Sequence, residues 1–505
     1  MKNLITTKIL VFSLSIMLLF GSCERFLTEE PHSFLAPENY YQTEDDAFSA
    51  LVGVYNGLGS SGVTFLARTL HYITWFPSDE ASTFASAQRQ LDNFQYNAAN
   101  PEISSVWTQM YIVINRANVF IDRFPQVAMD EEKKSQFIAE ARFVRALAYF
   151  YGVRLWGGIP LIVNEVKSVD EVSILSRASA ASVYEQVVLD LNYAAENLPP
   201  INQEGRATLG AAKALLAKVY LTRASSEAGQ STDYQNCASL AAEVIAMPNY
   251  NLLPDFQQVF GPTNEFNEES IFEWQADRVL APSGVNSIFG HFMLPRDILG
   301  FYPEADQAGE GTIFSEIAFF NLFNENDYSK ESTFITEGTN RQGQHITWQQ
   351  FTYPYPHAAK KYIGEDGLSR NERGFSANFM ILRLADVYLM RAEALNEVDG
   401  PTQEAYEMVN ALRRRARNRD GSPSLYPEDL AGLTKDGFRD AVLNERAFEL
   451  AFEGHRWFDL VRTKRLIETI KSSHPEYPIS EKHYLFPIPA DELIINSNLT
   501  QNPGW

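Results

Sequence analysis

The chain has 505 residues, of which 45% are hydrophobic and 21% charged, and its formal net charge is −22. Its 34 Phe, 23 Tyr and 7 Trp are too much apolar surface to leave in water, so a disordered chain is excluded, and the length allows two or three domains. The acidic excess argues against non-specific binding to nucleic acid, which needs a basic face. With only 2 Cys, a disulfide scaffold and a multi-cysteine metal site are also excluded.

The first 22 residues have the pattern of a secretion signal. Lys2 and Lys8 precede an apolar run at 9–20, which at about 1.5 Å per residue is too short to span a bilayer core of about 30 Å. Small residues stand directly before Cys23, as in the lipobox of bacterial lipoproteins. This resemblance implies cleavage before Cys23 and its lipidation, which would anchor the protein to a membrane without inserting it. An ordinary signal peptide with a chance cysteine is the alternative.

Apolar residues at three- and four-residue spacing predict a mainly α-helical mature chain. Because the helices follow one another with short breaks, they favour stacked hairpins of the tetratricopeptide type, although no clean 34-residue period is present. Asp130 is expected to cap the helix at 131–156, and a capping box at Ser182 to Glu185 is expected to open the next one. The expected helices cover residues 45–58, 104–124, 131–156, 182–198, 207–224, 233–246, 379–398, 402–417, 435–453 and 455–470.

Residues 248–378 differ from the rest of the chain. Proline and glycine are frequent there, helical periods are weak, and only 270–275 reads as a strand. Long irregular segments inside a compact protein are more often functional than idle. We therefore expect this loop-rich region to carry the ligand site.

Recognisable sequence stretches are spread over nearly the whole mature chain. They are Cys23–Pro31, Ala139–Phe150, Trp156–Leu161, Ala211–Tyr220, Leu382–Ala394, Asn444–Arg462, Phe486–Leu493 and Gln501–Trp505. Together they resemble the SusD/RagB family of outer-membrane lipoproteins from Bacteroidetes, while the segment from about 250 to 375 matches only loosely.

The resemblance implies a mainly α fold, in which stacked tetratricopeptide-like hairpins support long irregular loops. It implies a signal peptide at 1–22, an N-terminal helical domain at 23–230 and a C-terminal domain at 231–505 that includes the loop-rich region. It also implies a lipid-anchored protein at the cell surface that sits over a SusC-type TonB-dependent transporter of the outer membrane. The captured nutrient is a glycan in most members and a peptide in a few, and neither catalysis nor a cofactor comes with the family.

The stretch 444–462 is tempting as an active site, because Glu445, Glu449 and Glu453 share one helix face. The arginines nearby are Arg446, Arg456 and Arg462. Acid–base chemistry is one interpretation. A partly buried ion-pair network that locks the last helices together is favoured, since an unpaired buried charge would be costly.

Two further motifs are weak. The stretch Gly57–Gly62 fits the dinucleotide fingerprint G-x-G-x-x-G, but it follows a helix instead of a strand, so a turn is expected. The basic run Arg413–Arg417 is expected at a helix C-terminus, where positive charge is favoured. No metal-binding motif and no nucleophile motif is found in the sequence.

A glycan site needs flat aromatic rings for the apolar faces of sugars, with polar side chains at the edges. The best candidate is Trp75, expected in a non-helical segment with Arg68 and Asp79 near it. The other candidates are Tyr302 and the cluster Trp348, Tyr353 and Tyr355.

The remaining tryptophans are expected in the core at Trp107, Trp156 and Trp457, and Trp274 on the strand is a weaker candidate for exposure. Three rival functions stay open. The protein could be a peptide-binding member of the family, a surface glycoside hydrolase, or a structural lid without a ligand.

Overall fold

The computed structural model describes residues 42–59, 65–66, 68–261, 263–276, 287–301, 308–363, 375–419 and 421–505. The predicted signal peptide, the lipidation site at Cys23 and the candidate Tyr302 lie outside these residues. Within them, the search for a helix with the length and apolar character of a membrane span found none.

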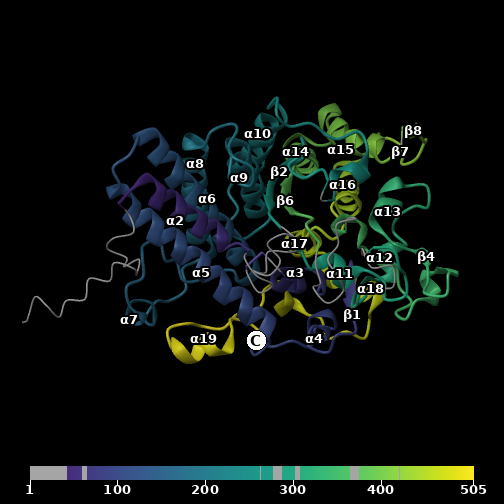
Figure 1. Cartoon of the computed structure of the whole chain (residues 1–505), viewed down its shortest axis with the longest axis horizontal. Coiled ribbons are helices and arrows are strands. Elements are labelled where there is room, and N and C mark those ends of the chain that lie inside the picture. Colours follow the sequence, from purple (N-terminus) through teal and green to yellow (C-terminus); the bar gives the residue numbers. More distant parts are fainter. Residues whose placement is uncertain are drawn as a thin grey trace, which may run out of the picture.

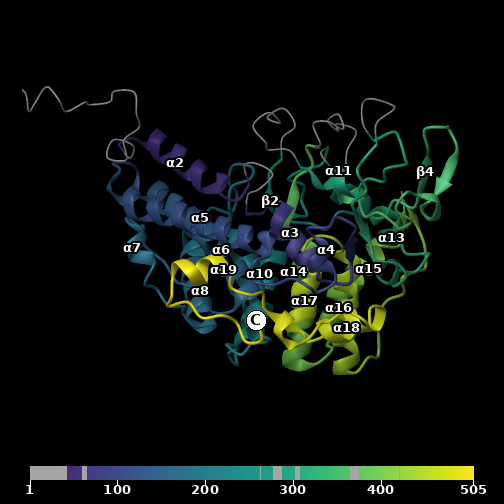
Figure 2. The same cartoon turned by 90° about the horizontal axis from the view of Figure 1, so that it is seen from below.

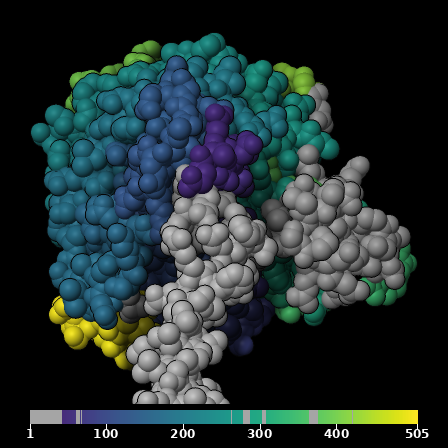
Figure 3. All heavy atoms as spheres, turned by 60° about the vertical axis from the view of Figure 1, so that its left-hand side comes forward, coloured from purple at the N-terminus to yellow at the C-terminus, as the bar shows by residue number. Residues whose placement is uncertain are grey.

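The N-terminal half is built from helices that pack against one another in chain order, and they lie on the left of Figure 1. Their bounds are α2 (Glu44–Asn56), α5 (Pro101–Arg123), α6 (Glu131–Trp156), α8 (Ala180–Asn197), α9 (Leu209–Ala224) and α10 (Asp233–Ile245). The space-filling view shows α2 in purple on the outer surface, across the blue helices α5 and α6 (Figure 3).

Side-chain caps explain where most of these helices begin. The N-cap side chains of Thr43, Asn100, Asp130 and Thr208 each accept a hydrogen bond from a backbone N–H of the first turn, which satisfies donors that have no partner inside the helix. The predicted cap at Asp130 is thus confirmed. The predicted cap at Ser182 is wrong, because Ser179 occupies that position and accepts from the Ser182 N–H.

The C-terminal helices continue the stack on the right of Figure 1, where α10 packs against α14. These helices are α14 (Leu384–Asp399), α15 (Gln403–Arg415), α16 (Lys435–Glu449), α17 (Arg456–Arg462) and α18 (Leu466–Ser473). The last helix, α19 (Ala490–Ile495), lies apart from them at the lower left of Figure 1. The structure therefore confirms the mainly α fold that the sequence predicts.

Two predicted C-terminal helices differ from the observed ones. The first five residues of the predicted helix 379–398 form β6 (Phe379–Arg383), which pairs antiparallel with β2 (Ser270–Trp274). A short apolar run of this kind suits a buried strand as well as a helix, so periodicity could not separate the two. The predicted helix 455–470 is two helices, because Lys464 between them has a left-handed backbone with φ of 59°.

The loop-rich region contains short elements, several of which gather at the upper right of Figure 2. Its strands include β3 (Ile313–Ser315), which pairs with β1 (Ala81–Thr83), and β4 (Glu337–Thr339), which pairs with β5 (His345–Thr347). A further hairpin joins β7 (Asn418–Arg419) to β8 (Ser422–Pro423). The short helices of this region are α11 (Phe289–Met293), α12 (Ile317–Phe320), α13 (Tyr328–Thr333), η3 (Phe256–Val259), η5 (Trp348–Gln350) and η6 (Lys360–Tyr362). Short helices elsewhere in the chain are α3 (Arg68–Trp75), α4 (Arg89–Asp92), α7 (Val169–Val172), η2 (Phe124–Gln126) and η7 (Glu481–Tyr484).

The hydrophobic core runs through both helical halves and under the loop-rich region. Trp107, Trp156 and Trp457 are all buried in it, as the sequence predicts. Helix α6 ends at Gly157, whose φ of 72° is readily adopted only by glycine. This turn leads the chain out of the core toward α8.

Candidate functional site

Four aromatic rings from distant parts of the sequence meet at the surface beside the β1–β3 pair. Phe84 follows β1, Phe314 lies in β3, and Tyr353 and Tyr355 come from the segment after η5. The Phe84 ring centroid lies 5.0 Å from that of Phe314 and 5.3 Å from that of Tyr353, and Phe314 stacks on Tyr355 at 4.2 Å. We call these four residues the aromatic platform.

The platform has a buried base and an exposed top. Phe314 is 1% exposed and Phe84 is 44% exposed, while Tyr353 and Tyr355 are half-buried. An exposed phenylalanine keeps apolar surface in water at a free-energy cost, so a flat ring held in this way is suited to cover the apolar face of a ligand.

Hydrogen bonds hold the platform in place from both sides. In the β1–β3 pair, Thr83 Oγ1 donates to the Thr312 carbonyl at 2.7 Å. In the other segment, Asp297 accepts from the Thr352 N–H at 2.6 Å and from its hydroxyl at 2.7 Å. Tyr353 and Tyr355 therefore follow an anchored residue, which limits the freedom of their rings.

Two guanidinium groups flank the rings. The Arg89 guanidinium carbon lies 5.4 Å from the Phe84 ring centroid, and that of Arg296 lies 5.8 Å from the Tyr353 centroid. Such groups donate several hydrogen bonds in a fixed geometry. Stacking rings with donors at their edges can hold a molecule with apolar faces and a rim of hydroxyl groups.

Trp348, the third member of the predicted cluster, lies in η5 and is half-buried. Its ring centroid is 6.4 Å from that of the buried Phe320, so part of its surface packs onto the protein body. It stays a candidate at the margin of the site, next to the segment that carries Tyr353 and Tyr355.

The structure contradicts the assignment of Trp75 as a ligand-stacking ring. Trp75 is the last residue of α3, is 0% exposed, and packs against Phe289 with 5.3 Å between ring centroids. Every residue of α3 from Thr69 to Trp75 is buried. Helix α3 has only eight residues, which is too short for a helical period to stand out, and its polar residues are buried together with the apolar ones.

The two residues predicted beside Trp75 also contact other side chains of the protein. Asp79 is buried and accepts from Nε and Nη2 of Arg456, both at 2.7 Å. Arg68 is half-buried beside Tyr72, with 5.7 Å from its guanidinium carbon to the ring centroid. The ion pair of Asp79 joins the segment after α3 to α17, so its role is to hold the fold.

Trp274 packs against Gly59 of the glycine-rich stretch. Trp274 is buried, and its Nε1 donates to the Gly59 carbonyl at 3.1 Å. A Cβ atom on Gly59 would lie 1.6 Å from that nitrogen, which is far inside van der Waals contact. Gly59 is therefore needed for close packing against Trp274. This packing accounts for the glycine at this position of the motif without a role in phosphate binding.

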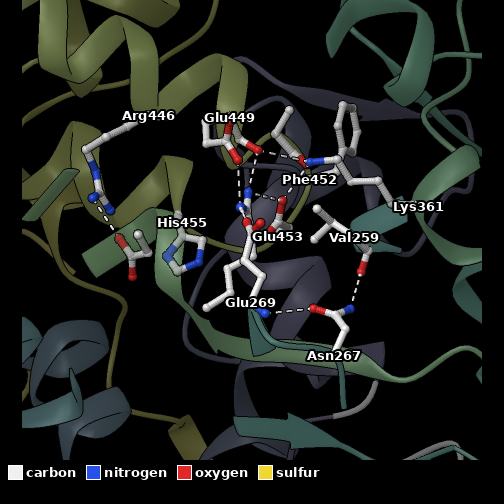
Figure 4. A network of polar contacts seen from close by, with 12 residues as sticks. Val259, Asn267, Glu269, Lys361, Arg446, Glu449, Phe452, Glu453 and His455 are labelled. Atoms are coloured by element: carbon white, nitrogen blue, oxygen red, sulfur yellow. Dashed lines mark hydrogen bonds and ion pairs between the residues drawn. The ribbon is translucent and has the colours of Figure 1, made fainter. Parts of the chain in front are cut away.

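The glutamates of the 444–462 stretch belong to a buried ion-pair network, confirming the favoured interpretation (Figure 4). Arg383 at the end of β6 is 1% exposed and donates to Glu269 at 2.9 Å, Glu449 at 2.6 Å and Glu453 at 2.6 Å. Lys361 adds a bond from its Nζ to Glu453 at 2.6 Å. The network thus joins β6, α16 and η6 with the residue before β2. It therefore connects more of the fold than the last helices, which the sequence predicted it to lock together.

A second part of the network centres on Arg446. It donates to Asp386 and to Asp459, both at 2.7 Å, and so connects α16 to α14 and α17. Arg462 binds Asp459 at 2.9 Å and also pairs with Glu393. These side chains form what we call the ion-pair network, together with the Arg383 group.

Burial and neighbouring charges together set the pKa values of the groups in the network. Burial opposes ionisation of Glu453, but Arg383 and Lys361 outweigh it and lower its pKa to about 2. Burial and the adjacent Lys218 lower the pKa of His455 to about 3, so its imidazole is neutral at pH 7. A carboxylate held ionised between two cations is poorly suited to take up a proton in acid–base catalysis.

The basic run at the end of α15 is occupied by carboxylates as well. Arg413 binds Glu445 at 2.6 Å, and Arg415 binds Glu269 at 2.6 Å and also pairs with Glu449. The other pairs of this run are Arg414 with Glu407 and Asp429, and Arg417 with Asp429. These contacts reduce the positive charge available to a polyanion. Among the described residues, no cluster of His, Cys, Asp or Glu is arranged to hold a metal ion.

Comparison with known proteins identifies the family. A family model described as SusD family matches residues 296–505, and one described as "Starch-binding associating with outer membrane" matches residues 26–221. SusD-like protein P2 of Formosa agariphila is 32% identical over 504 residues, which cover 95% of this chain and 96% of that protein. The chain belongs to the SusD/RagB family.

Solved structures of SusD-like proteins have the same fold as this chain. A laminarin-binding SusD-like protein superposes with a TM-score of 0.76 at 28% identity, covering 92% of this chain and all of that one. A SusD homologue from Bacteroides thetaiotaomicron superposes with a TM-score of 0.81 at 25% identity, covering 93% and 98%.

In this SusD/RagB protein, Phe84 and Phe314 are candidate residues that the sequence did not indicate. Phe84 stands among small residues in Ala81-Ser-Thr-Phe-Ala-Ser-Ala87, which cannot cover a large ring. That isolation was a usable signal of exposure. Phe314 carried no signal, because its role depends on the pairing of β1 with β3.

Proposed function

We propose that this SusD/RagB protein is a cell-surface, lipid-anchored glycan-binding protein that captures oligosaccharide on the aromatic platform. It holds the ligand without cleaving it and passes it to a partner SusC-type TonB-dependent transporter. Lipidation at Cys23 provides the outer-membrane anchor, and the helical domains divide near residue 230, between the segments that the two family models match.

The observation that carries the proposal is the exposed Phe84 ring, 44% exposed and fixed 5.3 Å from Tyr353 over a buried phenylalanine. Sugar rings present apolar C–H faces that such a surface covers, and arginines at its edges can bind their hydroxyl groups. The laminarin-binding relative and the starch-binding description of the matching family model support a glycan as the ligand.

The ion-pair network supports binding without catalysis. The carboxylates of the 444–462 stretch are engaged by arginines, as with Glu449 and Arg383 at 2.6 Å. The net charge of −22 favours a neutral glycan, since polyanions would be repelled at long range.

The test is affinity electrophoresis of the lipid-free protein against laminarin, starch, other polysaccharides and a peptide mixture. We expect retardation by a polysaccharide and its loss in the double variant Phe84→Ala, Tyr353→Ala. Phe48→Ala is the matched control, because Phe48 is also exposed, at 37%, but lies on α2.

Other outcomes would point to the rival functions. Binding of peptides alone would favour a peptide-binding member of the family. Release of reducing ends from a polysaccharide would indicate a hydrolase, and absence of binding to the whole panel would leave the structural lid. Retardation that survives in the double variant would contradict the platform as the site.

A further inference from the structure

A pocket of about 330 Å³ lies between the ends of α6 and α9, the start of α8, helix α17 and the C-terminal tail. Its lining includes Arg154, Tyr184, Phe458, Lys464, Lys482 and Tyr484. This volume is at the lower end of the range for small-molecule sites, about 300–1,000 Å³. None of its lining residues belongs to the aromatic platform, so it is a separate feature.

Arg154 differs from the other buried arginines of the described residues. Six of them form ion pairs with carboxylates, namely Arg145, Arg223, Arg383, Arg415, Arg446 and Arg456. Arg154 is only 9% exposed, yet no carboxylate of the described residues lies within 4.0 Å of its guanidinium nitrogens. Asp459 attracts it from farther away, and the Tyr151 side chain forms a hydrogen bond with it. A buried cation without a carboxylate in direct contact is costly, and natural proteins rarely keep one.

Aromatic rings surround the guanidinium in place of a carboxylate. Its carbon lies 3.7 Å from the ring centroid of Phe458, 4.0 Å from that of Phe150 and 4.6 Å from that of Tyr151. Its Nε donates to the Phe150 carbonyl at 3.2 Å. The rings hold the planar group in one orientation, which prepares its terminal nitrogens for a flat, two-oxygen acceptor.

The remaining polar groups of the pocket leave Arg154 as the main binder of an anion. The hydroxyl groups of Thr222, Ser225 and Ser226 already donate to carbonyls of their own segment. Lys464 and Lys482 add positive charge at the rim, where Glu227 and Glu481 oppose it. One buried cation that no carboxylate contacts directly, between mostly apolar walls, matches a monoanion better than a dianion.

We propose that this pocket binds a small organic molecule with one carboxylate, of about the size of a monosaccharide. The carboxylate accepts two hydrogen bonds from the terminal nitrogens of Arg154, and the body of the ligand packs against Tyr184, Phe458 and Tyr484. The site goes beyond the proposed glycan platform and does not depend on it.

Calorimetric titration with glucuronate and with glucose tests the proposal, because the two probes differ in one carboxylate on the same ring. We expect glucuronate to bind at least about tenfold more tightly than glucose, because only glucuronate offers a carboxylate to the Arg154 guanidinium. Equal binding of the two probes, or binding of neither, would overturn the proposal.

Two variants show whether glucuronate binds in this pocket. Arg154→Met removes the guanidinium and is expected to abolish the preference for glucuronate. Ala228→Trp fills the pocket from its rim while leaving Arg154 unchanged, and it should also abolish glucuronate binding, which decides the question if Arg154→Met does not fold.

The matched control is Arg142→Met, because Arg142 lies on the same helix but contacts Tyr193 and Asp190 outside the pocket. This variant should bind glucuronate as the unaltered protein does. Glucuronate binding that persists in Arg154→Met or in Ala228→Trp would contradict the assignment.

Discussion

The ion-pair network and the aromatic platform are opposite in construction. The network is buried, charged and formed by residues of a recognisable sequence stretch, with Arg383 at 1% exposure. The platform is partly exposed, aromatic and built from residues in segments without a recognisable pattern, with Phe84 at 44%. This difference indicates that the recognisable sequence stretches mark the scaffold, while the proposed binding surface lies in the loops that the scaffold supports.

The largest expected effect is on the network. Arg383→Met leaves Glu269, Glu449 and Glu453 buried without their shared cation, and we expect a loss of about 3–5 kcal/mol in the free energy of unfolding. Urea denaturation measures it.

Arg414→Met is the control for that change, because Arg414 pairs with Glu407 and Asp429 at 44% side-chain exposure. Exposed pairs contribute about 0–1 kcal/mol. Similar losses in the two variants would show that burial of the network does not matter to stability.

A change at Trp75 should affect stability without affecting glycan binding. Trp75→Ala removes a fully buried ring and should cost about 3–5 kcal/mol of stability. Any glycan affinity of the molecules that remain folded should be unchanged, which affinity electrophoresis at low temperature can determine. A selective loss of binding at unchanged stability would restore Trp75 as a ligand residue.

A smaller effect is expected on the platform. Phe84→Ala should weaken glycan binding by about 1–2 kcal/mol, because one stacking surface is lost. Since the ring is partly exposed, its removal should change stability by only about 0.5 kcal/mol. Titration calorimetry and thermal unfolding of the same sample give both values, and a stability loss as large as that of Trp75→Ala would mean that Phe84 belongs to the core.

The last prediction concerns the dependence of stability on pH. Glu80 is 0% exposed, and burial raises its pKa from its ordinary value of 4.5 to about 8. Between these values the folded state keeps a proton that the unfolded state releases, so this group lowers stability as pH rises.

Glu80→Gln should remove that dependence. The variant keeps an oxygen for the Phe452 N–H, which Glu80 accepts at 3.0 Å, and it cannot ionise. We expect its stability relative to the unaltered protein to increase from pH 5 to pH 8, measured by urea denaturation at each pH. A constant difference across this range would show that Glu80 is ionised in the fold.

The sequence predicted the scaffold better than the site, for physical reasons. Amphipathic helices such as α5 and α10 carry one apolar stripe, so their periodicity revealed them. Helix α3 has eight residues and β6 has five, so both are too short for a period to identify them.

The site depended on contacts between segments far apart in the chain. Tyr353 and Tyr355 were predicted because they lie in an aromatic, irregular segment, whereas Trp75 was chosen wrongly by the same criterion. Composition could not tell a loop ring that faces water from one that faces the core. Phe84 and Phe314 become neighbours through the β1–β3 pairing, which joins residues more than 200 positions apart.

The decisive measurement is a crystal structure of the protein with a bound oligosaccharide, prepared from a polysaccharide that retards the protein in affinity electrophoresis. We expect a sugar ring stacked on Phe84 and Tyr353 at van der Waals contact, about 3.5–4.0 Å between carbon atoms, and an unchanged ion-pair network. A sugar bound away from these rings, or in contact with the carboxylates of Glu449 or Glu453, would contradict it.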